Sequence, residues 1–174
     1  MSYKYPTAVV FDLDYTLWPC WCDTHISMPL KPVSKREVVD RYGMQLKLYK
    51  DVEDILMELK SQDVTIIGAS RTATPRVAQE LLSLFHINGI PMIKYFHSLQ
   101  WGQGSKIKHI TKAAKLLGMH DDLEEGGFIL FDDELRNRDV TSINCEFVHI
   151  DETKGLTRGV FEKGLQVWTE NRNE

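Results

Sequence analysis

Residues 7–17 read Thr7-Ala-Val-Val-Phe-Asp-Leu-Asp-Tyr-Thr-Leu17, which joins a short apolar run to two carboxylates one residue apart. An apolar run without polar alternation is typical of a strand that a parallel sheet buries on both faces. Ligands bind open α/β sheets beyond the carboxyl ends of the strands, where Asp12 and Asp14 are expected to lie. Two like charges at such a point are costly, so the pair predicts a compensating cation, and hard carboxylate oxygens suit Mg²⁺. On position alone, a pair of solvated loop acids remains the alternative.

Strand-like runs of this kind recur along the chain and alternate with helical patterns. Further strands are predicted at 64–69, 91–96, 127–131 and 146–150, the second of them interrupted by Lys94. Cap residues and apolar spacing predict four helices. The first begins after Asp51 and includes Leu59, the second runs from Thr74-Pro75 towards Phe85, the third runs from Ser105 to Gly118, and the fourth covers 157–168. The alternation predicts an α/β fold, a three-layer Rossmann-like parallel sheet with helices on both faces.

Residues 19–49 do not follow the alternation. This segment contains three prolines and no strong helical pattern. Within it, residues 38–48 predict a small β-hairpin that turns near Tyr42-Gly43. The segment is too short for an independent domain but long enough to lie as a flap over the end of the first strand. We therefore expect a single domain over residues 1–174 that carries this hairpin as an insertion.

Length and composition narrow the classes of protein that remain. A chain of 174 residues corresponds to about one domain. Hydrophobic residues make up 43% and charged residues 26%, which excludes a disordered chain. No apolar run approaches the roughly 18 residues of a membrane-spanning helix, so we expect no membrane partner. The formal net charge of −4 argues against nucleic acid as a partner.

Cysteine usage and the N-terminus bear on the compartment. Cys20, Cys22 and Cys145 form neither a disulfide framework nor a usual four-ligand zinc spacing, although His25 lies close to the first two. Reduced thiols in a reducing compartment are the favoured interpretation. The first residues lack the charged and apolar regions of a secretory signal. We therefore expect an intracellular, cytoplasmic protein.

A second acidic cluster, Asp132-Asp133-Glu134, follows the apolar run at 127–131. Because the carboxyl ends of parallel strands meet at one edge of the sheet, we expect these acids to lie near Asp12 and Asp14, where they would also bind a metal ion. The alternative is that one of them caps the next helix, with Arg136 or Arg138 as a neutralising partner.

Two further segments offer groups that bind anions. Ser70-Arg71-Thr72 comes directly after the run at 64–69, so a hydroxyl, a backbone N–H and a guanidinium stand at the start of a helix. Lys106 begins the next helix, where its charge opposes the helix dipole unless an anionic partner offsets it. Taken separately, the first segment is more often a helix cap, and Lys106 is more often a surface lysine.

In chain order these groups are Asp-x-Asp-x-Thr, Ser, Lys and Asp-Asp, and this order resembles the four motifs of the haloacid-dehalogenase superfamily of aspartate-nucleophile phosphatases. The match is closer to its small eukaryotic magnesium-dependent phosphatases. Phe11-Asp-Leu-Asp-Tyr-Thr-Leu-Trp-Pro19, with Trp21 and Asp23-Thr-His25, resembles that family's first motif. The other three motifs resemble Ala69-Ser-Arg-Thr72, Gly104-Ser-Lys106 and Phe131-Asp-Asp-Glu134 with Arg136-Asn137. The resemblance covers residues 7–150, and Lys31 to Arg41 gives no distinctive match.

The resemblance implies a role for each matching residue. Asp12 would attack phosphorus to give an aspartyl-phosphate, and Asp14 would act as general acid and then general base. Mg²⁺ would be held by Asp12, by the backbone carbonyl of Asp14 and by one acid of the Asp132-Asp133 pair, with Asp133 favoured as the direct ligand. The phosphoryl group would be held by Ser70 and Lys106, and Arg71 would bind the phosphate or a second substrate group.

The resemblance also bears on the substrate. Large cap domains of the superfamily follow the first or second motif, and neither interval here has room for one. A site without a large cap admits bulky phosphomonoesters, whether a phosphorylated small molecule or a phosphoprotein. The resembling family is associated with phosphotyrosine and with sugar phosphates. Tyr15, Trp18 and Trp21 would line an aromatic entrance, or would instead pack the hairpin onto the sheet. We expect a monomer.

Two other classes share some of these residues. A phospho-accepting receiver domain also has an acidic pair, a hydroxyl, a lysine and a phosphorylated aspartate, but its acidic pair follows the first strand and its lysine comes last. In this chain Lys106 precedes Asp132-Asp133, and Asp14 supplies an acid–base group that receivers lack. The second alternative, an inactive interaction module on the same fold, does not account for the intact set of acids, Ser70 and Lys106.

Overall fold

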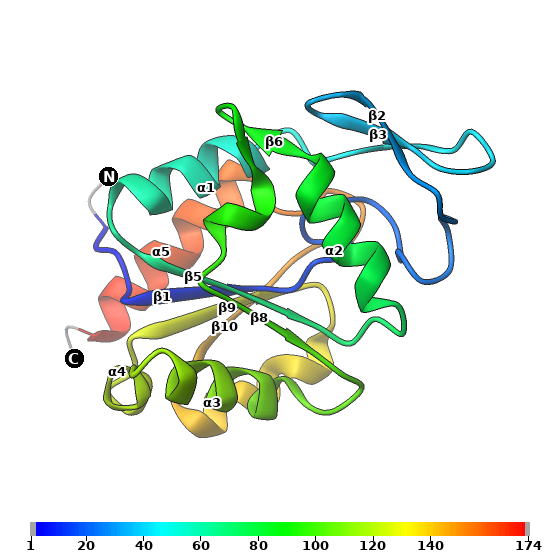
Figure 1. Ribbon diagram of the computed structural model, residues 1–174. Helices are drawn as coiled ribbons and strands as arrows, with labels where there is room; N and C mark the ends of the chain where they lie inside the picture. Colours follow the sequence, from blue (N-terminus) through cyan, green and yellow to red (C-terminus); the bar gives the residue numbers. More distant parts are fainter. Residues whose placement is uncertain (1–2, 173–174) are drawn as a thin grey trace.

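The computed structural model describes residues 3–172 and contains a five-stranded parallel sheet at its centre (Figure 1). The strand order is β10-β9-β1-β5-β8, in which β1 pairs directly with both β5 and β9. All four residues of β1 are buried, as the apolar run predicted. The strands are β1 (Ala8–Phe11), β5 (Thr65–Ser70), β8 (Ser98–Trp101), β9 (Phe128–Asp132) and β10 (Glu146–His149).

Helices cover both faces of this sheet, which confirms the predicted three-layer architecture. Successive residues of β1 point to opposite faces, so Val9 and Phe11 belong to one core while Ala8 and Val10 belong to the other. The first core includes buried residues of α1 (Val52–Ser61), α2 (Pro75–Leu84) and α5 (Arg158–Arg172). The second includes residues of α3 (Lys106–Leu116), α4 (His120–Glu124) and the 3₁₀ segment η2 (Leu135–Ile143). Figure 1 shows α1, α2 and α5 on one side of the sheet and α3 and α4 on the other.

Helix caps follow the predictions in part. Ser105 accepts a hydrogen bond from the backbone N–H of Lys108 at 3.4 Å and so caps α3. Asp51 and Thr74 precede α1 and α2 as expected, but neither side chain caps its helix. The Asp51 carboxylate instead accepts a hydrogen bond from the backbone N–H of Arg158, 2.9 Å away. That prediction was therefore right about where the helices begin and wrong about what these two side chains do.

The strand predicted at 91–96 is wrong. Two short antiparallel strands of two residues each, β6 (His86–Ile87) and β7 (Ile90–Pro91), precede the 3₁₀ helix η1 (Met92–Tyr95). Met92 and Tyr95 are three residues apart, so one turn buries both side chains, and the Tyr95 hydroxyl donates to the carbonyl of Ile87. The fifth strand of the sheet is β8, which is an edge strand with an alternating polar sequence and a weak apolar signal.

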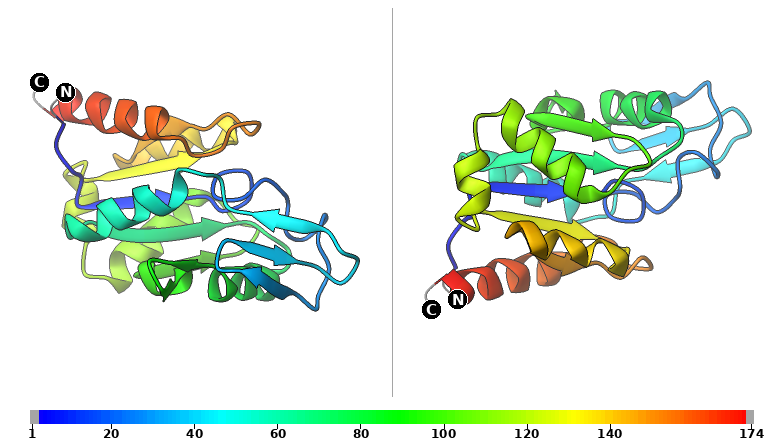
Figure 2. Two further views of the ribbon diagram at one scale, coloured as in Figure 1. Left: turned by 90° about the horizontal axis from the view of Figure 1, so that it is seen from above. Right: turned by 90° about the horizontal axis from the view of Figure 1, so that it is seen from below.

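A small antiparallel sheet lies beyond the carboxyl ends of the central strands (Figure 2). Its strands are β2 (Lys31–Ser34), β3 (Glu37–Val39) and β4 (Gln45–Lys47). The hairpin predicted over 38–48 is formed by β3 and β4, and its turn includes Gly43 at φ +87°. Strand β2 was not predicted because all four of its residues are exposed and Pro32 interrupts the pattern. No larger insertion interrupts the sheet within residues 3–172, and none of the helices there is long and apolar enough to cross a membrane.

Candidate active site

The carboxyl ends of three adjacent strands bring the predicted site residues together. Asp12 and Asp14 follow β1, Ser70 and Arg71 stand at the end of β5, and Asp132 and Asp133 stand at the end of β9. Lys106 joins them from the first turn of α3. A cavity of about 310 Å³ is lined by all of these residues except Asp132, which is fully buried behind it. The cavity is also lined by Trp21, Asp23, Thr24, Thr72, Gln103, Glu134 and Arg136. Among these residues only Gln103 had no signal in the sequence.

Lys106 is a buried ion-pair partner rather than a surface lysine. Its side chain is 2% exposed, and its Nζ donates to Asp12 Oδ1 at 2.9 Å and to the Ala69 carbonyl at 2.6 Å. The same Nζ lies 3.1 Å from Asp132 Oδ2. Burial alone would lower the pKa of Lys106, but Asp12 and Asp132 outweigh it and raise the pKa, so the ammonium form is favoured.

Three carboxylates surround this ammonium group. Oxygens of Asp12, Asp132 and Asp133 all lie within 4.8 Å of one another. Burial raises the pKa of Asp12 well above its usual value, and the neighbouring acids add to that effect while Lys106 opposes it. Burial likewise raises the pKa of Asp133 to about 6, with Asp132 adding to the rise. One ammonium cannot balance three carboxylates, so this all-oxygen cluster fits a divalent cation such as Mg²⁺.

The two acids of the Asp132-Asp133 pair have different surroundings. Asp132 Oδ1 accepts a hydrogen bond from the backbone N–H of Glu134 at 3.0 Å, and its Oδ2 accepts one from Asn137 Nδ2 at 2.8 Å in addition to the contact with Lys106. Its lone pairs are therefore largely occupied by the protein. The side chain of Asp133 is only partly buried and lines the cavity.

Asp14 lies in a tight loop that reverses directly after β1. The loop is closed by a hydrogen bond from the backbone N–H of Tyr15 to the Trp18 carbonyl at 2.7 Å, with Tyr15 in the left-handed region at φ +59°. Asp14 Oδ1 accepts hydrogen bonds from Trp18 Nε1 at 2.7 Å and from the backbone N–H of Cys22 at 3.2 Å. Burial raises the pKa of Asp14 despite these donors. A raised pKa favours the protonated carboxyl group, which is the form that can give a proton to a leaving group.

A segment near the end of the chain also supports this loop. The backbone N–H of Leu156 donates to the Thr16 carbonyl at 2.9 Å. Beside it, Gly155 lies against the ring of Tyr49, whose hydroxyl donates to the Glu152 carbonyl at 2.9 Å. The loop that carries Asp14 therefore depends on residues far away in the sequence.

Ser70 and Arg71 face the cavity from the end of β5. Ser70 Oγ accepts a hydrogen bond from the backbone N–H of Thr72 at 3.1 Å, which leaves the Ser70 hydroxyl hydrogen available for another acceptor. The Arg71 guanidinium donates through one Nη to Asn137 Oδ1, while its buried Nε has no partner among the described residues. Asn137 therefore contacts both Arg71 and Asp132. The resemblance named this asparagine, but neither contact could be read from the sequence.

The aromatic residues near the site fall into two groups. Trp18 is fully buried and stacks on Phe85, with ring centroids 6.3 Å apart. Of the two predicted roles, it therefore has the packing role and does not line the entrance. Trp21 is 49% exposed and lines the cavity. One face of its ring stacks on His25 at a centroid distance of 5.4 Å, and Tyr15 meets it edge-on at 5.6 Å.

The three cysteines are free and buried. Within residues 3–172, no group with metal-binding geometry includes a cysteine or His25, so a zinc site at Cys20 and Cys22 has no support there. Burial is the main cause that raises the pKa of the Cys20 thiol to about 12.

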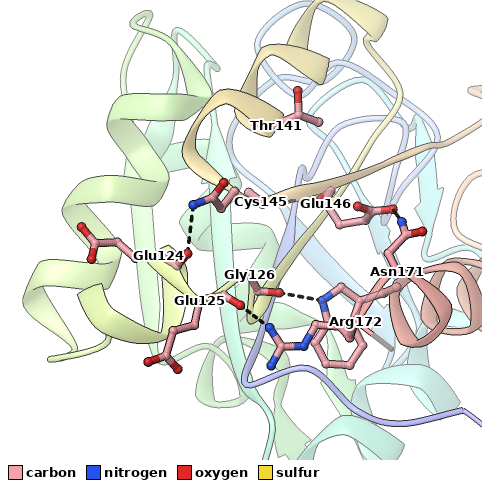
Figure 3. Close-up of a pocket in the computed structure, with 10 residues that line it drawn as sticks. Glu124, Glu125, Gly126, Thr141, Cys145, Glu146, Asn171 and Arg172 are labelled. Atoms are coloured by element: carbon pink, nitrogen blue, oxygen red, sulfur yellow. Dashed lines mark hydrogen bonds between the residues drawn. The ribbon is translucent and has the colours of Figure 1, made fainter. Parts of the chain in front are cut away.

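A second, larger cavity of about 440 Å³ lies at the opposite edge of the sheet (Figure 3). Its hydrogen bonds tie chain segments together: Trp168 Nε1 donates to the Gly126 carbonyl at 2.8 Å, and Arg172 donates to the Glu125 carbonyl. It contains none of the residues at the carboxyl ends of the strands, where ligands bind this kind of sheet. The smaller cavity with the acid cluster is therefore the candidate active site.

Comparisons with known proteins identify the family of this chain. Residues 4–171 match the model of the family described as acid phosphatase. A candidate magnesium-dependent phosphatase of Saccharomyces cerevisiae is 41% identical over 155 residues, which cover 84% of this chain and 87% of the yeast protein. Magnesium-dependent phosphatase 1 of Homo sapiens is 36% identical over 166 residues, or 95% of this chain and 88% of the human protein.

A comparison of folds gives the same architecture. The structure of a haloacid-dehalogenase-superfamily hydrolase from Ehrlichia chaffeensis superimposes with a TM-score of 0.62 at 14% identity. The match covers 99% of this chain and 100% of that one. At this identity the likeness concerns the fold alone.

Proposed function

This chain belongs to the acid phosphatase family and is a magnesium-dependent phosphatase of the haloacid-dehalogenase superfamily, and on that basis we propose that it hydrolyses phosphomonoesters through an aspartyl-phosphate on Asp12. The observation that carries the proposal is the fixed carboxylate of Asp12. One of its oxygens is held 2.9 Å from the Lys106 ammonium, beside a cavity that Ser70 and Asp14 also line. A positioned nucleophile next to an acid–base group and anion-binding groups is the arrangement that phosphoryl transfer requires.

In the first step, a carboxylate oxygen of Asp12 attacks phosphorus and the bond from phosphorus to the leaving oxygen breaks. The carboxyl group of Asp14 gives its proton to that oxygen. In the second step, a water molecule attacks phosphorus, the bond from phosphorus to Asp12 breaks, and a proton of the water passes to Asp14. Both carboxyl groups then return to their starting forms, and inorganic phosphate leaves. Ser70, Arg71 and Lys106 hold the phosphoryl oxygens, where positioned donors and charge contribute most.

The magnesium ion fits the acid cluster described above. Asp12 and Asp133 would hold it through side-chain oxygens and Asp14 through its backbone carbonyl, while Asp132 is occupied by Lys106, Asn137 and Glu134. When bound, Mg²⁺ neutralises carboxylate charge and withdraws electron density from the phosphoryl oxygens. Asp133 is the favoured direct ligand because its carboxylate faces the cavity.

The substrate class that the site favours is an aryl phosphomonoester such as phosphotyrosine, with sugar phosphates as the second candidate. One observation favours the first: the half-exposed ring of Trp21 lines the cavity, and its stacking on His25 fixes its orientation. An aromatic leaving group would stack or pack against that ring. A site with no large cap within residues 3–172 also leaves room for a side chain that projects from a protein.

The mechanism is tested with Asp12→Asn. Wild-type protein is expected to hydrolyse p-nitrophenyl phosphate with Mg²⁺ and to lose that activity in EDTA, and Asp12→Asn is expected to be inactive. An acid quench during turnover should trap a phosphoryl group on a peptide that contains Asp12. Turnover by the variant would remove Asp12 as nucleophile, whereas stoichiometric phosphorylation without turnover would favour a receiver-like function.

The substrate class is tested with Trp21→Ala. We expect kcat/KM for a phosphotyrosine peptide to fall by about tenfold while that for a sugar phosphate changes little, because a buried aromatic contact contributes on the order of 1 kcal/mol or more. Equal losses for both substrates would contradict aromatic recognition by Trp21.

A further inference from the structure

Trp18 and Cys22 lie within the span of the first motif and donate hydrogen bonds to Asp14. The proposed reaction gives neither residue a role. Trp18 is fully buried, and among the described residues its side chain makes one hydrogen bond, which runs from Nε1 to Asp14 Oδ1 and is 2.7 Å long. The backbone N–H of Cys22 donates to the same oxygen at 3.2 Å. Two N–H groups therefore hold Oδ1 of Asp14.

The other oxygen of Asp14 is held much more weakly. Among the described residues, the one hydrogen-bond donor to Oδ2 is the Cys22 thiol, at 3.8 Å, and a thiol is a weak donor. That thiol is also 3.3 Å from the Thr72 hydroxyl, which competes for it. The carboxyl group is thus fixed through one oxygen while the other stays available for proton exchange.

From this asymmetry we infer that Trp18 is a positioning residue for the acid–base group: its indole N–H fixes Asp14 Oδ1 so that Asp14 Oδ2 is the oxygen that gives the proton to the leaving group and takes it back from water. The inference rests on the proposed function, because it assigns an atom and a support to the acid–base role of Asp14. The stacking of Trp18 on Phe85, at 6.3 Å between centroids, anchors the indole in the main core. The orientation of Asp14 is therefore set by a residue that does not line the cavity.

A positioning role predicts a specific dependence on the leaving group. A poor leaving group, such as an alkyl or phenyl oxygen, needs its proton in the transition state, whereas a dinitrophenyl oxygen departs with little help. If Asp14 is misaligned, kcat/KM must fall most for the poor leaving groups. A variant that is merely less stable, or that binds phosphate less well, loses the same factor for every ester.

The test is to measure kcat/KM of Trp18→Phe with Mg²⁺ for phenyl, p-nitrophenyl and dinitrophenyl phosphates. We expect a loss of about tenfold or more for phenyl phosphate and less than about threefold for dinitrophenyl phosphate, because acid catalysis typically contributes 10²–10⁴-fold. The matched control is Trp168→Phe, which removes a similar indole hydrogen bond, 2.8 Å long, at the other edge of the sheet. This control is expected to leave the leaving-group dependence unchanged.

A second variant separates the lost N–H from the lost ring volume. Benzothienylalanine at position 18 keeps the two-ring shape and replaces the N–H by sulfur, so it should reproduce the steep leaving-group dependence even where Trp18→Phe folds poorly. A uniform loss for all three esters, or none, would overturn the positioning role.

Asp14→Asn distinguishes this inference from the mechanism on which it rests. If that variant also shows no steeper dependence on the leaving group, the acid–base role of Asp14 itself is wrong. If kcat/KM depends more steeply on the leaving group in Asp14→Asn but not in the two variants at position 18, the mechanism stands and the role of Trp18 is wrong.

Discussion

Lys106 Nζ lies 2.9 Å from Asp12 Oδ1, and both groups are buried. Because the same ammonium also reaches Asp132 at 3.1 Å, one cation partly balances the acid cluster before any metal binds. Removing one partner of a buried ion pair leaves the other charge without compensation, which is far more costly than the net contribution of the pair.

Lys106→Met should therefore lower both activity and stability. We expect hydrolysis of p-nitrophenyl phosphate to fall below detection and the free energy of unfolding in EDTA to fall by about 3 kcal/mol, the range for breaking a buried pair. Urea unfolding measures the stability, and saturating Mg²⁺ should recover part of it. The control is Lys112→Met, an exposed lysine of the same helix, for which both quantities should stay near wild type. An unchanged urea midpoint for Lys106→Met in EDTA would contradict this account of the cluster.

The two acids at the end of β9 should respond differently to the same substitution. Asp133→Asn is expected to raise the Mg²⁺ concentration for half-maximal activity by more than about tenfold, with a near-native urea midpoint. Asp132→Asn should instead destabilise the protein by about 2 kcal/mol, because its Oδ2 accepts from Asn137 and contacts Lys106. Magnesium titrations of activity and urea unfolding of both variants check this. The reverse pattern would make Asp132 the direct ligand.

Glu58 makes part of the stability depend on pH. Burial alone would raise the pKa of this carboxyl, but hydrogen bonds from the Tyr5 hydroxyl and from Arg158, each 2.7 Å long, lower it below its usual value. Because the pKa of Glu58 is lower in the folded state, its ionisation stabilises the folded protein. This stabilisation is fully present above the unfolded-state pKa of about 4.3 and is lost as the pH falls through the folded-state pKa. Glu58→Gln should therefore cost roughly 1 kcal/mol at neutral pH and progressively less in acid. Urea unfolding from about pH 7 to pH 3 measures the difference, with the exposed Glu125→Gln as control. If the difference in unfolding free energy between wild type and Glu58→Gln grew as the pH fell, the direction assigned to the pKa shift of Glu58 would be wrong.

Gly155 should not tolerate a side chain. It has φ +64°, and a Cβ there would lie 2.1 Å from the Tyr49 ring. Gly89→Ala is the matched control, since Gly89 has φ +76° and open space around it. We expect Gly89→Ala to cost about 1 kcal/mol from backbone strain and Gly155→Ala to cost at least about 2 kcal/mol more from the clash. If urea unfolding gave the same loss of unfolding free energy for Gly155→Ala and Gly89→Ala, the Tyr49 ring would have to move aside at little cost.

The central strands and the edge strand β10 could be predicted from sequence, whereas the other edge strand, β8, could not. Strands β1, β5 and β9 are buried on both faces and therefore appear as continuous apolar runs. Strand β8 lies at the edge and alternates Ser, Leu, Gln and Trp, while the more apolar 92–95 segment forms a 3₁₀ turn. Local pattern cannot separate these two, because the difference lies in which segment reaches β5.

The position of the site followed from strand ends, but the contacts within it did not. Asp12 and Ser70 directly follow or end buried strands, so their convergence follows from a parallel sheet. The burial of Lys106, the link from Arg71 to Asp132 through Asn137, and the contact of Trp18 with Asp14 depend on side-chain directions. No residue spacing specifies those directions.

The hydrogen bond from Leu156 to the Thr16 carbonyl has a consequence for synthesis of the protein. Strand β1 leaves the ribosome before its neighbours β5 and β9, and the segment that closes the Asp14 loop follows after both. Domains tend to fold as units, and contacts between distant residues form slowly. A nascent chain from which residue 156 has not yet emerged therefore lacks a completed Asp14 loop, so catalytic competence should arise only after that residue has left the ribosome.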